Sequence, residues 1–567
     1  MTVEPSLAYC AALIDALASQ GVNHACVSPG SRNTPLLIAL AAHPAIDVSV
    51  HHDERSAAFF ALGLAKATGG LPLLSCTSGT AATEYHPAVT EARMAHVGMI
   101  VLTADRPPEL QDRGSPQTIN QTNLYGVAAK WFHDIGVPDA ESVGNAGSLA
   151  RKAVATALDV PAGPVHLNLP LREPLVPTEK LDPAFTTTTA TAPAVAPRIA
   201  AAEPEIARIA EVVSGRPTVI VAGQSNSPGL GAAVSAAAAA LDAIVIADPQ
   251  SEIRFAGADD PALVSFADLL IAGGFTGAAA PAAVLHVGAI ATSKPLNQWL
   301  ESLGVDLVHI DDGRWHDPLR IATSVVVADP ARTLSALAKI VEPGPSGFAA
   351  AWRRADDTAL SVLENSLAGL SEPAIAATLI ETVPAGSLIV AGSSMPIRLI
   401  DSYASRRVRP ARLIANRGAN GIDGTIATAL GVATAGIGPT YALLGDLTAL
   451  VDIGSLATAS RLNTPLTIVT INNDGGGIFD YLPHSDPERI EPGTFRELIT
   501  TPHGQSLAVI ASALGVESCE VSDLETLGSL LAAAPAEPRL IEVRTNRADG
   551  PRRRAEIIER IAAAVAT

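Results

Sequence analysis

The sequence predicts an α/β protein with three α/β domains, each built on a parallel, doubly wound sheet. Strand-like apolar runs alternate with helix-like runs along the whole chain, and hydrophobic residues make up 48% of it. Many strand-like runs end in glycine or small polar residues, as in parallel sheets whose ligands lie beyond the carboxyl ends of the strands. At 567 residues the chain is also too long for a single hydrophobic core.

Two stretches rich in proline and small residues divide the chain. The first, 176–198, is rich in Thr, Pro and Ala and has no apolar period, and the second, 341–348, carries two prolines and two glycines. They predict domains at about 1–180, 200–340 and 350–567. No repeat of fixed period is present.

The first domain begins with a predicted helix whose Leu7, Ala11 and Ile14 share one face. A short strand, 24–27, leads into the loop "SPGSRNTP" and another helix. Glu54 stands just before a further helix with an apolar face, which Gly69 and Gly70 end. Buried strands follow within 71–81 and 99–107, so the pattern is that of a doubly wound parallel sheet.

The other two domains repeat this alternation. Strand-like runs of the middle domain lie at 218–223, 243–248 and 283–288, and those of the third domain lie at 387–394, 413–424, 440–446 and 466–472. Between the last two runs, Leu450, Ile453 and Ala457 fit one face of a crossover helix. The residues that follow these two strands are therefore expected at the same edge of one sheet.

Composition excludes some partners. The net charge of −19 argues against nucleic acid or an anionic membrane surface as a general partner. The four cysteines have no metal-ligand spacing, and the first residues lack the pattern of a signal peptide. The alanine-rich stretch 232–247 is interpreted as a helix and a strand, not a membrane span. We expect a cytoplasmic protein.

A polar motif follows the last two strands. "GDL" places Asp446 after one strand, and "NNDGGG" places Asn473 and three glycines after the next, 27 residues later. Side-chain oxygens suit a hard divalent cation, and glycines let the backbone approach a bulky anion. Each part alone is also typical of an ordinary turn. The interval, the paired asparagines and the glycine run together favour a site for a metal-bound diphosphate.

This motif resembles the cofactor signature of thiamine-diphosphate enzymes, although Leu447 stands where glycine is usual. The resemblance implies the fold of that family. It also implies that Asp446, Asn473 and the Gly475 carbonyl bind the metal, with magnesium or manganese left open. Gly476 is implied as a further cofactor contact.

The family also uses a glutamate of the first domain as an acid–base group beside the aminopyrimidine ring, and Glu54 matches its context. Asp53 could fill the same role. Alternatively, either carboxylate could only interact favourably with the helix dipole. The resemblance places Ile422 under the bent cofactor.

Further motifs resemble one branch of the family, which acts in menaquinone biosynthesis and joins 2-oxoglutarate, after loss of CO2, to isochorismate. They include "SPGSRNTPL", "TADRPPEL", "NRGANGIDGT" and "TPHG". Both substrates are dicarboxylates, which arginine can hold through two hydrogen bonds. The basic residues that match substrate-binding positions of the branch are Arg32, Arg106, Lys294, Arg398 and Arg417.

The branch also implies several other contacts. Ser31 and Gln117 match polar substrate positions, Ser394 matches a cofactor position, and Ile478 with Phe479 would form an apolar wall beside the reactive carbon. Pro295 follows Lys294 where some members carry a second basic residue.

Three alternatives to this interpretation are considered. An acetolactate synthase or another thiamine-diphosphate decarboxylase or ligase would take small 2-oxo acids, which do not account for five basic residues at one site. A non-catalytic relative should have lost Glu54 or a metal ligand. A kinase or ATPase should show GxxxxGK[ST], which is missing. The family resemblance further implies a homodimer with shared active sites, and leaves a homotetramer open.

Overall fold

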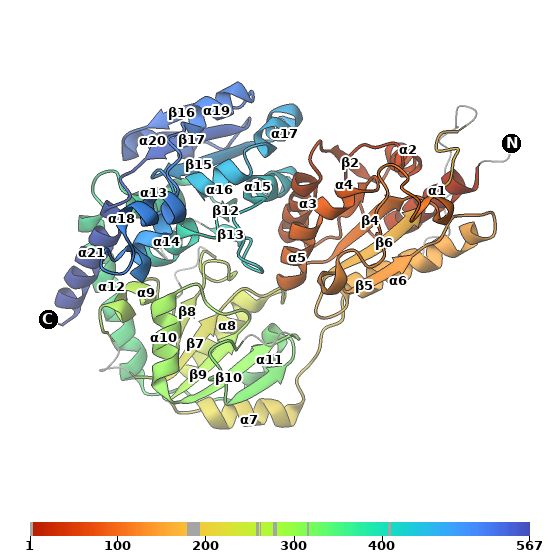
Figure 1. Ribbon diagram of the computed structural model, residues 1–567. Helices are drawn as coiled ribbons and strands as arrows, with labels where there is room; N and C mark the ends of the chain where they lie inside the picture. The colour runs from red at the N-terminus through yellow and green to blue at the C-terminus, as the bar shows by residue number, and fades with distance from the viewer. Residues whose placement is uncertain are drawn as a thin grey trace. The chain divides into compact units, whose positions relative to one another are not determined.

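Three parallel sheets form the framework of the chain in the computed structural model (Figure 1). The structure describes residues 4–177, 193–256, 260, 262–275, 280–313, 317–405 and 410–566. The α/β class with three parallel sheets is confirmed. Most of the first predicted linker, 178–192, lies outside the described residues. No described helix combines the length and apolarity that a membrane crossing requires.

The chain groups into two compact units. The first contains residues 1–197, 416–437 and 451–464, and the second contains 198–415, 438–450 and 465–567. The second unit therefore holds two of the three sheets.

The sheet of the first unit has the order β2-β1-β3-β4-β6-β5. Every neighbouring pair is parallel. Its central strands are buried along their whole length, which explains their continuous apolar sequences. The strands are β1 His24–Val27, β2 Asp47–Val50, β3 Leu73–Cys76, β4 Met99–Asp105, β5 Trp131–Asp134 and β6 Pro164–Pro170.

Helices cover both faces of this sheet. On one face α1 packs against α2 and α6, and on the other α3 packs against α5. The helices of this unit are α1 Pro5–Ser19, α2 Thr34–Ala42, α3 Glu54–Thr68, α4 Thr80–Glu84, α5 His86–Met94, α6 Ala146–Leu158, α15 Thr425–Thr434 and α17 Ser455–Leu462.

Two glycines let α3 and α15 come into backbone contact. A Cβ atom at Gly63 would lie 2.0 Å from the carbonyl oxygen of Thr428, and one at Gly431 would lie 2.0 Å from that of Phe60. Any side chain at either position would force the helices apart. This packing explains why α15 groups with the first sheet although it lies between strands of the third sheet in the sequence.

The prediction of one crossover helix between 446 and 466 is wrong. The chain forms α16 Asp446–Val451 and α17, with a break between them. Asp452 is buried at the break and accepts hydrogen bonds from Ala427 N and Ser455 Oγ, both 2.8 Å long. Its burial raises the pKa of its carboxyl to about 6. The carboxylate thus connects the break to α15 and to the first residue of α17.

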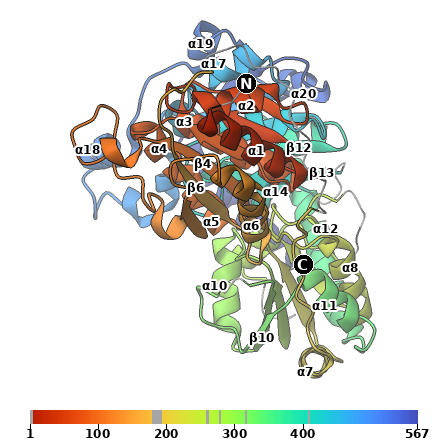
Figure 2. The same ribbon diagram turned by 90° about the vertical axis from the view of Figure 1, so that its right-hand side faces the viewer.

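The second sheet has the order β11-β10-β9-β7-β8. Figure 2 shows α8 beside α11, which it contacts. The strands are β7 Thr218–Ala222, β8 Ile244–Ala247, β9 Ala283–Val287, β10 Asp306–Asp311 and β11 Ser324–Val327. The helices are α7 Glu203–Val213, α8 Leu230–Leu241, α9 Ala267–Ala272, α10 Lys294–Leu303 and α11 Pro330–Leu337.

The third sheet has the order β13-β12-β14-β15-β17-β16, also parallel throughout. Its strands are β12 Ser387–Ala391, β13 Ala411–Ala415, β14 Thr440–Gly445, β15 Leu466–Asn472, β16 Glu517–Val521 and β17 Arg539–Arg544. The helices of this part are α12 Ser346–Ser366, α13 Glu372–Thr382, α14 Met395–Tyr403, α16, α18 Pro492–Thr494, α19 Leu507–Ala513, α20 Leu524–Ala532 and α21 Asp549–Val565.

The second and third sheets share one hydrophobic core. Phe266 and Trp299 from the second-sheet part lie in the same buried cluster as Trp352 and Ile541. The stretch 341–348, predicted as a linker, is irregular only to Pro345, because α12 begins at Ser346. Most of α12 thus serves as a packing element of this common core.

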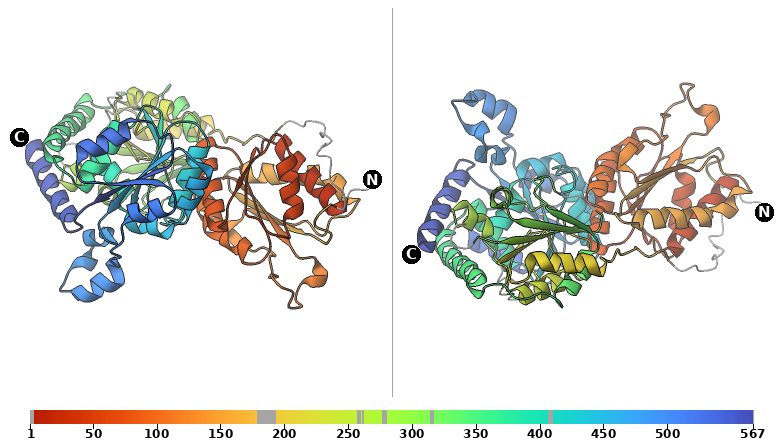
Figure 3. Two further views of the ribbon diagram at one scale, coloured as in Figure 1. Left: turned by 90° about the horizontal axis from the view of Figure 1, so that it is seen from above. Right: turned by 90° about the horizontal axis from the view of Figure 1, so that it is seen from below.

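A segment with α18 projects from the third-sheet part (Figure 3). It follows β15 and contains the short 3₁₀ helix Gly477–Tyr481 and the π-helix Phe495–Thr500. Leu498 on the π-helix is 75% exposed. The segment begins at the glycine run, so it lies directly beside the predicted metal site.

The stability of the first unit should depend on pH because of the buried histidine His166. Its Nε2 lies 2.8 Å from Thr103 Oγ1, and burial lowers its pKa to about 3. An unfolded histidine titrates near 6.5, so the unfolded state binds more protons, and the free energy of unfolding falls as the pH drops below about 6.5. Between pH 7 and pH 4, the free energy of unfolding should therefore fall by about 3 kcal/mol less in His166→Gln than in wild type.

Urea unfolding at several pH values measures this difference. His133→Gln, a change at an exposed position on β5, is the control and should follow the wild-type curve. Parallel pH curves for wild type and His166→Gln would contradict the assignment.

Candidate active site

The predicted metal ligands meet at the carboxyl edge of the third sheet. β14 and β15 are parallel neighbours with Gly445 opposite Ile471, so Asp446 and Asn473 follow adjacent strand ends. Asp446 is 2% exposed. Its Oδ2 accepts hydrogen bonds from the backbone N–H groups of Asn473 (3.1 Å) and Gly475 (2.9 Å), and its Oδ1 accepts from Leu447 N (2.7 Å). The loop after β15 is thus folded around this carboxylate.

The side chain of Asn473 is fixed from one side. Its Nδ2 donates to Glu372 Oε1 over 2.8 Å, while its Oδ1 is buried and has no hydrogen-bond partner. A buried carbonyl oxygen without a partner is costly unless a ligand satisfies it. Asp446, this oxygen and the nearby carbonyls form a donor set that fits magnesium or manganese, which take oxygen ligands and complete their shell with phosphate.

The glycine run fits tightly against the π-helix. Gly475 has φ +128°, and a Cβ atom there would lie 2.1 Å from the carbonyl oxygen of Thr500. Gly476 N donates to the same oxygen over 2.7 Å. The glycines are therefore required by close packing within the loop itself, in addition to any approach of a ligand.

A buried carboxylate on β17 holds the neighbouring loop. Glu542 is fully buried and accepts from Asn472 Nδ2 (2.6 Å), Ser506 Oγ (2.9 Å) and Ala508 N (2.8 Å). His503 lies on the same loop with its Nε2 3.3 Å from Asp446 Oδ2. Its Nδ1 accepts from Gln505 N, and Nε2 is the nitrogen that faces the carboxylate.

Within the first unit, Glu54 begins α3. Asp53 is the N-cap, and its side chain accepts from Ser56 N over 3.2 Å. Glu54 is half-buried, and burial is the largest cause that raises the pKa of its carboxyl. Of the two carboxylates, Asp53 is the one that caps α3.

Arg32, Arg106 and Gln117 gather at the carboxyl edge of the first sheet. Arg106 bonds to Ser78 Oγ, and Gln117 Nε2 donates to Ser78 O over 3.2 Å. Arg32 is 6% exposed, donates to Leu171 O and has its Nε buried without a hydrogen-bond partner. Burial and then the charge of Arg32 lower the pKa of Arg106. Arg32 Nη2 also lies 3.6 Å from Glu173 Oε1. Ser31 is exposed beside Arg32.

The loop that carries Arg417 and Ile422 is tied down by a buried ion pair. Lys66 Nζ lies 3.1 Å from Glu91 Oε1, and Glu91 also accepts from the backbone N–H groups of Gly418 (2.9 Å) and Ala419 (2.6 Å). Arg417 and Ile422 are both half-buried. The ion pair thus fixes the backbone directly after Arg417.

Lys294, Ser394 and Arg398 lie in the second unit. Arg398 donates to the carbonyl oxygens of Ser393 and Ser394 at the start of its own helix, over 3.0 and 2.6 Å. Lys294 is exposed at the first position of α10, where Pro295 suits a helix start. Ile478 and Phe479 lie half-buried on the 3₁₀ helix after the glycine run.

Asp268 joins the two helices that carry these basic residues. Its carboxylate accepts from Ser293 Oγ, which caps α10, and from Ser402 Oγ on α14, each over 2.7 Å. Arg554 from α21 donates to the same carboxylate over 2.7 Å. Asp268 thus links the start of α10, which carries Lys294, to α14, which carries Arg398.

Sequence reasoning missed Glu372, Glu542 and the Lys66–Glu91 pair. Glu372 stands in "SEPAIAATL", where an acidic residue after serine is typical of an ordinary helix start. Glu542 offered a better signal, because a carboxylate in the middle of the buried strand "LIEVR" needs a partner. Burial also raises the pKa of Glu372, which its hydrogen bonds from Asn473 and Thr545 oppose.

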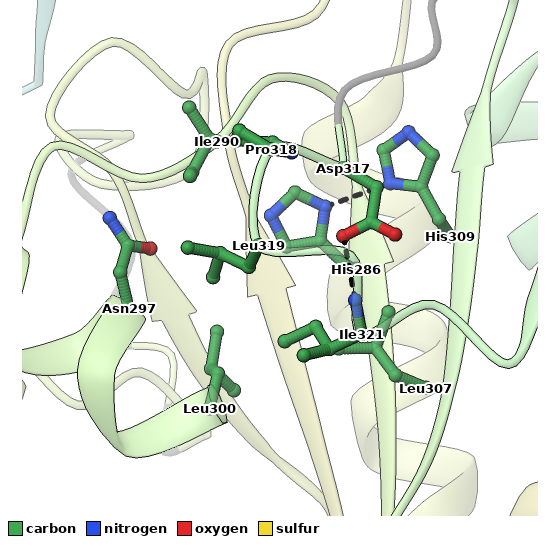
Figure 4. A pocket seen from close by; sticks show the side chains of 10 residues that line it. All are labelled: His286, Ile290, Asn297, Leu300, Leu307, His309, Asp317, Pro318, Leu319 and Ile321. Carbon is green, nitrogen blue, oxygen red and sulfur yellow. Dashed lines mark hydrogen bonds between the residues drawn. The ribbon is translucent and has the colours of Figure 1, made fainter. Parts of the chain in front are cut away.

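A separate small cavity lies in the second-sheet part (Figure 4). His286 and His309 meet there through their Nδ1 atoms at 3.0 Å, and Asp317 accepts from Ile321 N. Leu300 and Leu319 supply apolar wall. None of the residues predicted for the active site lines this cavity.

Family models match both end domains of the chain. Residues 8–124 match the thiamine pyrophosphate enzyme N-terminal TPP binding domain, and residues 399–543 match the C-terminal TPP binding domain. The chain is thus a thiamine pyrophosphate enzyme, and thiamine diphosphate is the same cofactor under another name. The 4-hydroxybenzoylformate decarboxylase of Rhodococcus jostii RHA1, which is thiamine diphosphate-dependent, has a similar fold. Its TM-score is 0.71 at 18% identity, over 95% of this chain and 99% of that one.

Relatives define the family more closely. The 2-succinyl-5-enolpyruvyl-6-hydroxy-3-cyclohexene-1-carboxylate synthase of Chloroflexus aurantiacus is 39% identical over 96% of this chain and 94% of the relative. That of Geobacillus kaustophilus is 40% identical over 96% of both. The chain belongs to the 2-succinyl-5-enolpyruvyl-6-hydroxy-3-cyclohexene-1-carboxylate synthase family, and the resemblance predicted from the sequence motifs is confirmed.

Proposed function

We propose that this enzyme decarboxylates 2-oxoglutarate and joins the remaining fragment to isochorismate in menaquinone biosynthesis. The identity of about 40% with synthases of that name over nearly the whole chain carries the proposal. The product is 2-succinyl-5-enolpyruvyl-6-hydroxy-3-cyclohexene-1-carboxylate, with release of CO2. A cytoplasmic location goes with this proposal.

In this proposal Asp446, Asn473 and the Gly475 carbonyl hold magnesium or manganese, and Gly476 lies against the cofactor's diphosphate. When bound, thiamine diphosphate supplies a carbon nucleophile by losing a proton from its thiazolium ring. The buried Asn473 Oδ1 and the Asp446 carboxylate support this metal site. Ile422, Ser394, Ile478 and Phe479 would pack around the cofactor rings.

Glu54 would hold and exchange a proton beside a ring nitrogen of the bound cofactor's aminopyrimidine. Its half-buried position and raised pKa suit a group that shares a proton instead of remaining fully ionised. Because Asp53 caps α3, the role falls to Glu54.

The substrate carboxylates are assigned to the basic residues. Arg32 and Arg106 would form an anion site of the first unit, with Ser31 and Gln117 beside it. Arg417 lies on the loop that Glu91 fixes, and Lys294 and Arg398 lie on the helices that Asp268 links. Five cations suit two dicarboxylates better than they suit small 2-oxo acids.

Release of CO2 from different 2-oxo acids separates this proposal from an acetolactate synthase. With thiamine diphosphate and magnesium, 2-oxoglutarate should be decarboxylated in the presence of isochorismate, and pyruvate should not replace it. Turnover of pyruvate at a comparable rate would favour the alternative enzyme.

Arg32→Ala and Arg417→Ala should lower kcat/KM by about 30-fold or more while cofactor affinity stays near wild type. Loss of a partner for a buried carboxylate costs about 2–5 kcal/mol. Steady-state kinetics with each substrate varied measure the effect. Arg113→Ala, an exposed arginine between Arg106 and Gln117, is the control and should match wild type. Normal kinetics in both variants would contradict the dicarboxylate site.

We also propose a homodimer in which each active site takes Glu54 from one chain and the metal ligands from its partner, with a tetramer as a dimer of such dimers. Glu54→Gln and Asp446→Ala proteins should each be nearly inactive alone. Refolded together in equal amounts, about half of the dimers are hybrids, each with one intact site, so about a quarter of wild-type activity should return. An inactive mixture, with hybrids proven by mass spectrometry, would contradict the shared site.

A further inference from the structure

Glu372 is a buried carboxylate placed directly behind a proposed metal ligand. It is the first residue of α13, after the N-cap Ser371, and is 5% exposed. Its Oε1 accepts from Asn473 Nδ2 over 2.8 Å and from Thr545 Oγ1 over 3.2 Å. A carboxylate at a helix start would ordinarily face solvent, so its burial against Asn473 calls for a reason.

The contact decides which way the Asn473 carboxamide points. A carboxamide has a donor side and an acceptor side, and Glu372 Oε1 is the acceptor in this contact. Glu372 therefore requires the NH2 group on its own side and turns Oδ1 away from itself. That oxygen is buried and has no hydrogen-bond partner, although Asn473 otherwise lies in a well-bonded loop. The unpaired oxygen destabilises the metal-free protein, and only a cation on the other side would offset this cost.

We propose that Glu372 is a positioning residue that locks the Asn473 carboxamide with Oδ1 presented to the divalent cation. This inference rests on the proposed function, because it takes Asp446, Asn473 and Gly475 as the metal site. Partners of this kind fix the orientation of metal ligands and commonly change metal affinity by about 10- to 100-fold when removed. Glu372 acts through Asn473 and touches neither cofactor nor substrate.

Two substitutions test the lock in different ways. Glu372→Gln keeps the shape but adds an NH2 group, so the Asn473 amide is free to flip and satisfy Oδ1 in the metal-free protein. Glu372→Asp keeps the charge but is one methylene shorter, so the hydrogen bond to Asn473 is lost. Calorimetric titration of the full-length protein with magnesium, at fixed thiamine diphosphate, should show an affinity about 10- to 100-fold lower in both variants.

Two controls separate this role from general stability. Glu381→Gln makes the same charge change at the exposed end of α13, and Thr545→Val removes only the second hydrogen bond to Glu372. Both should bind magnesium within about twofold of wild type, because the contact with Asn473 remains. Without metal, the unfolding temperature of Glu372→Gln should equal or exceed that of wild type, while its increase on adding magnesium and thiamine diphosphate should shrink.

The outcomes divide clearly. Wild-type magnesium affinity in both Glu372 variants, with wild-type protein showing metal-dependent cofactor binding, overturns the positioning role and leaves the proposed function intact. Lower stability of the metal-free variants with undiminished magnesium affinity also overturns it. A wild-type protein that binds thiamine diphosphate equally well without any divalent metal contradicts the metal site, and this inference falls with it.

Discussion

The Asp446→Ala variant is expected to lose saturable binding of thiamine diphosphate. Asp446 is the carboxylate around which the loop after β15 folds, and it accepts hydrogen bonds from Leu447, Asn473 and Gly475. Without it the proposed site keeps only neutral oxygen donors, which hold magnesium poorly. Excess EDTA should have the same effect on wild type. Calorimetry with the cofactor and magnesium measures the loss.

Two further variants guard against collapse of the loop as the cause. Asp446→Asn keeps an oxygen that accepts backbone hydrogen bonds but removes the charge, and it should also fail to bind. Glu488→Ala removes an exposed carboxylate from the projecting segment and should bind normally. Normal cofactor binding by Asp446→Ala would show that the metal ligands are assigned wrongly.

The Glu54→Gln variant should bind cofactor and metal but activate the cofactor about 10²- to 10⁴-fold more slowly than wild type. This factor is the usual contribution of a positioned acid–base group. Proton–deuterium exchange at the reactive carbon of bound thiamine diphosphate is the direct measurement. Because glutamine cannot share a proton with the aminopyrimidine, this variant should keep cofactor binding but lose most of the cofactor activation.

Asp53→Asn is the matched control for Glu54→Gln. Asparagine caps a helix about as well as aspartate, so α3 should keep its start while one charge beside Glu54 is lost. Exchange in Asp53→Asn should stay close to wild type. Slow exchange in Asp53→Asn together with normal exchange in Glu54→Gln would transfer the role to Asp53.

Much of the fold could be predicted because parallel strands leave a plain signal. The strands at 24–27, 440–445 and 466–472 are buried apolar runs that end in polar or glycine residues, and all were predicted within a residue or so. The same signal predicted that Asp446 and Asn473 follow adjacent strand ends. These apolar runs were sufficient for the prediction because each strand is buried on both faces.

The failures came from residues whose structural role depends on distant partners. Leu450, Ile453 and Ala457 show helical spacing, yet the chain breaks at Asp452, whose carboxylate bonds to Ala427 and Ser455. The grouping of α15 with the first sheet depends on close contact at Gly63 and Gly431. Neither contact can be predicted from the few residues around it in the sequence.

The candidate site shows the same division. Residues that would touch cofactor or metal were found through their motif, but Glu372 lies 101 positions from the asparagine that it orients. Its local sequence is that of a common helix start, so only the folded structure reveals the contact. The glycine run was interpreted as room for a ligand, and the structure adds packing of Gly475 against Thr500 as a second reason.

Product analysis by mass spectrometry shows directly whether the enzyme joins 2-oxoglutarate to isochorismate. The full-length enzyme, magnesium and thiamine diphosphate are incubated with isochorismate and uniformly ¹³C-labelled 2-oxoglutarate. We expect labelled CO2 and a product that contains isochorismate plus every carbon of 2-oxoglutarate except the released carboxyl group. This product should form only when both substrates and the cofactor are present. An unlabelled product, or a labelled one that forms equally well without isochorismate, would contradict the proposed reaction.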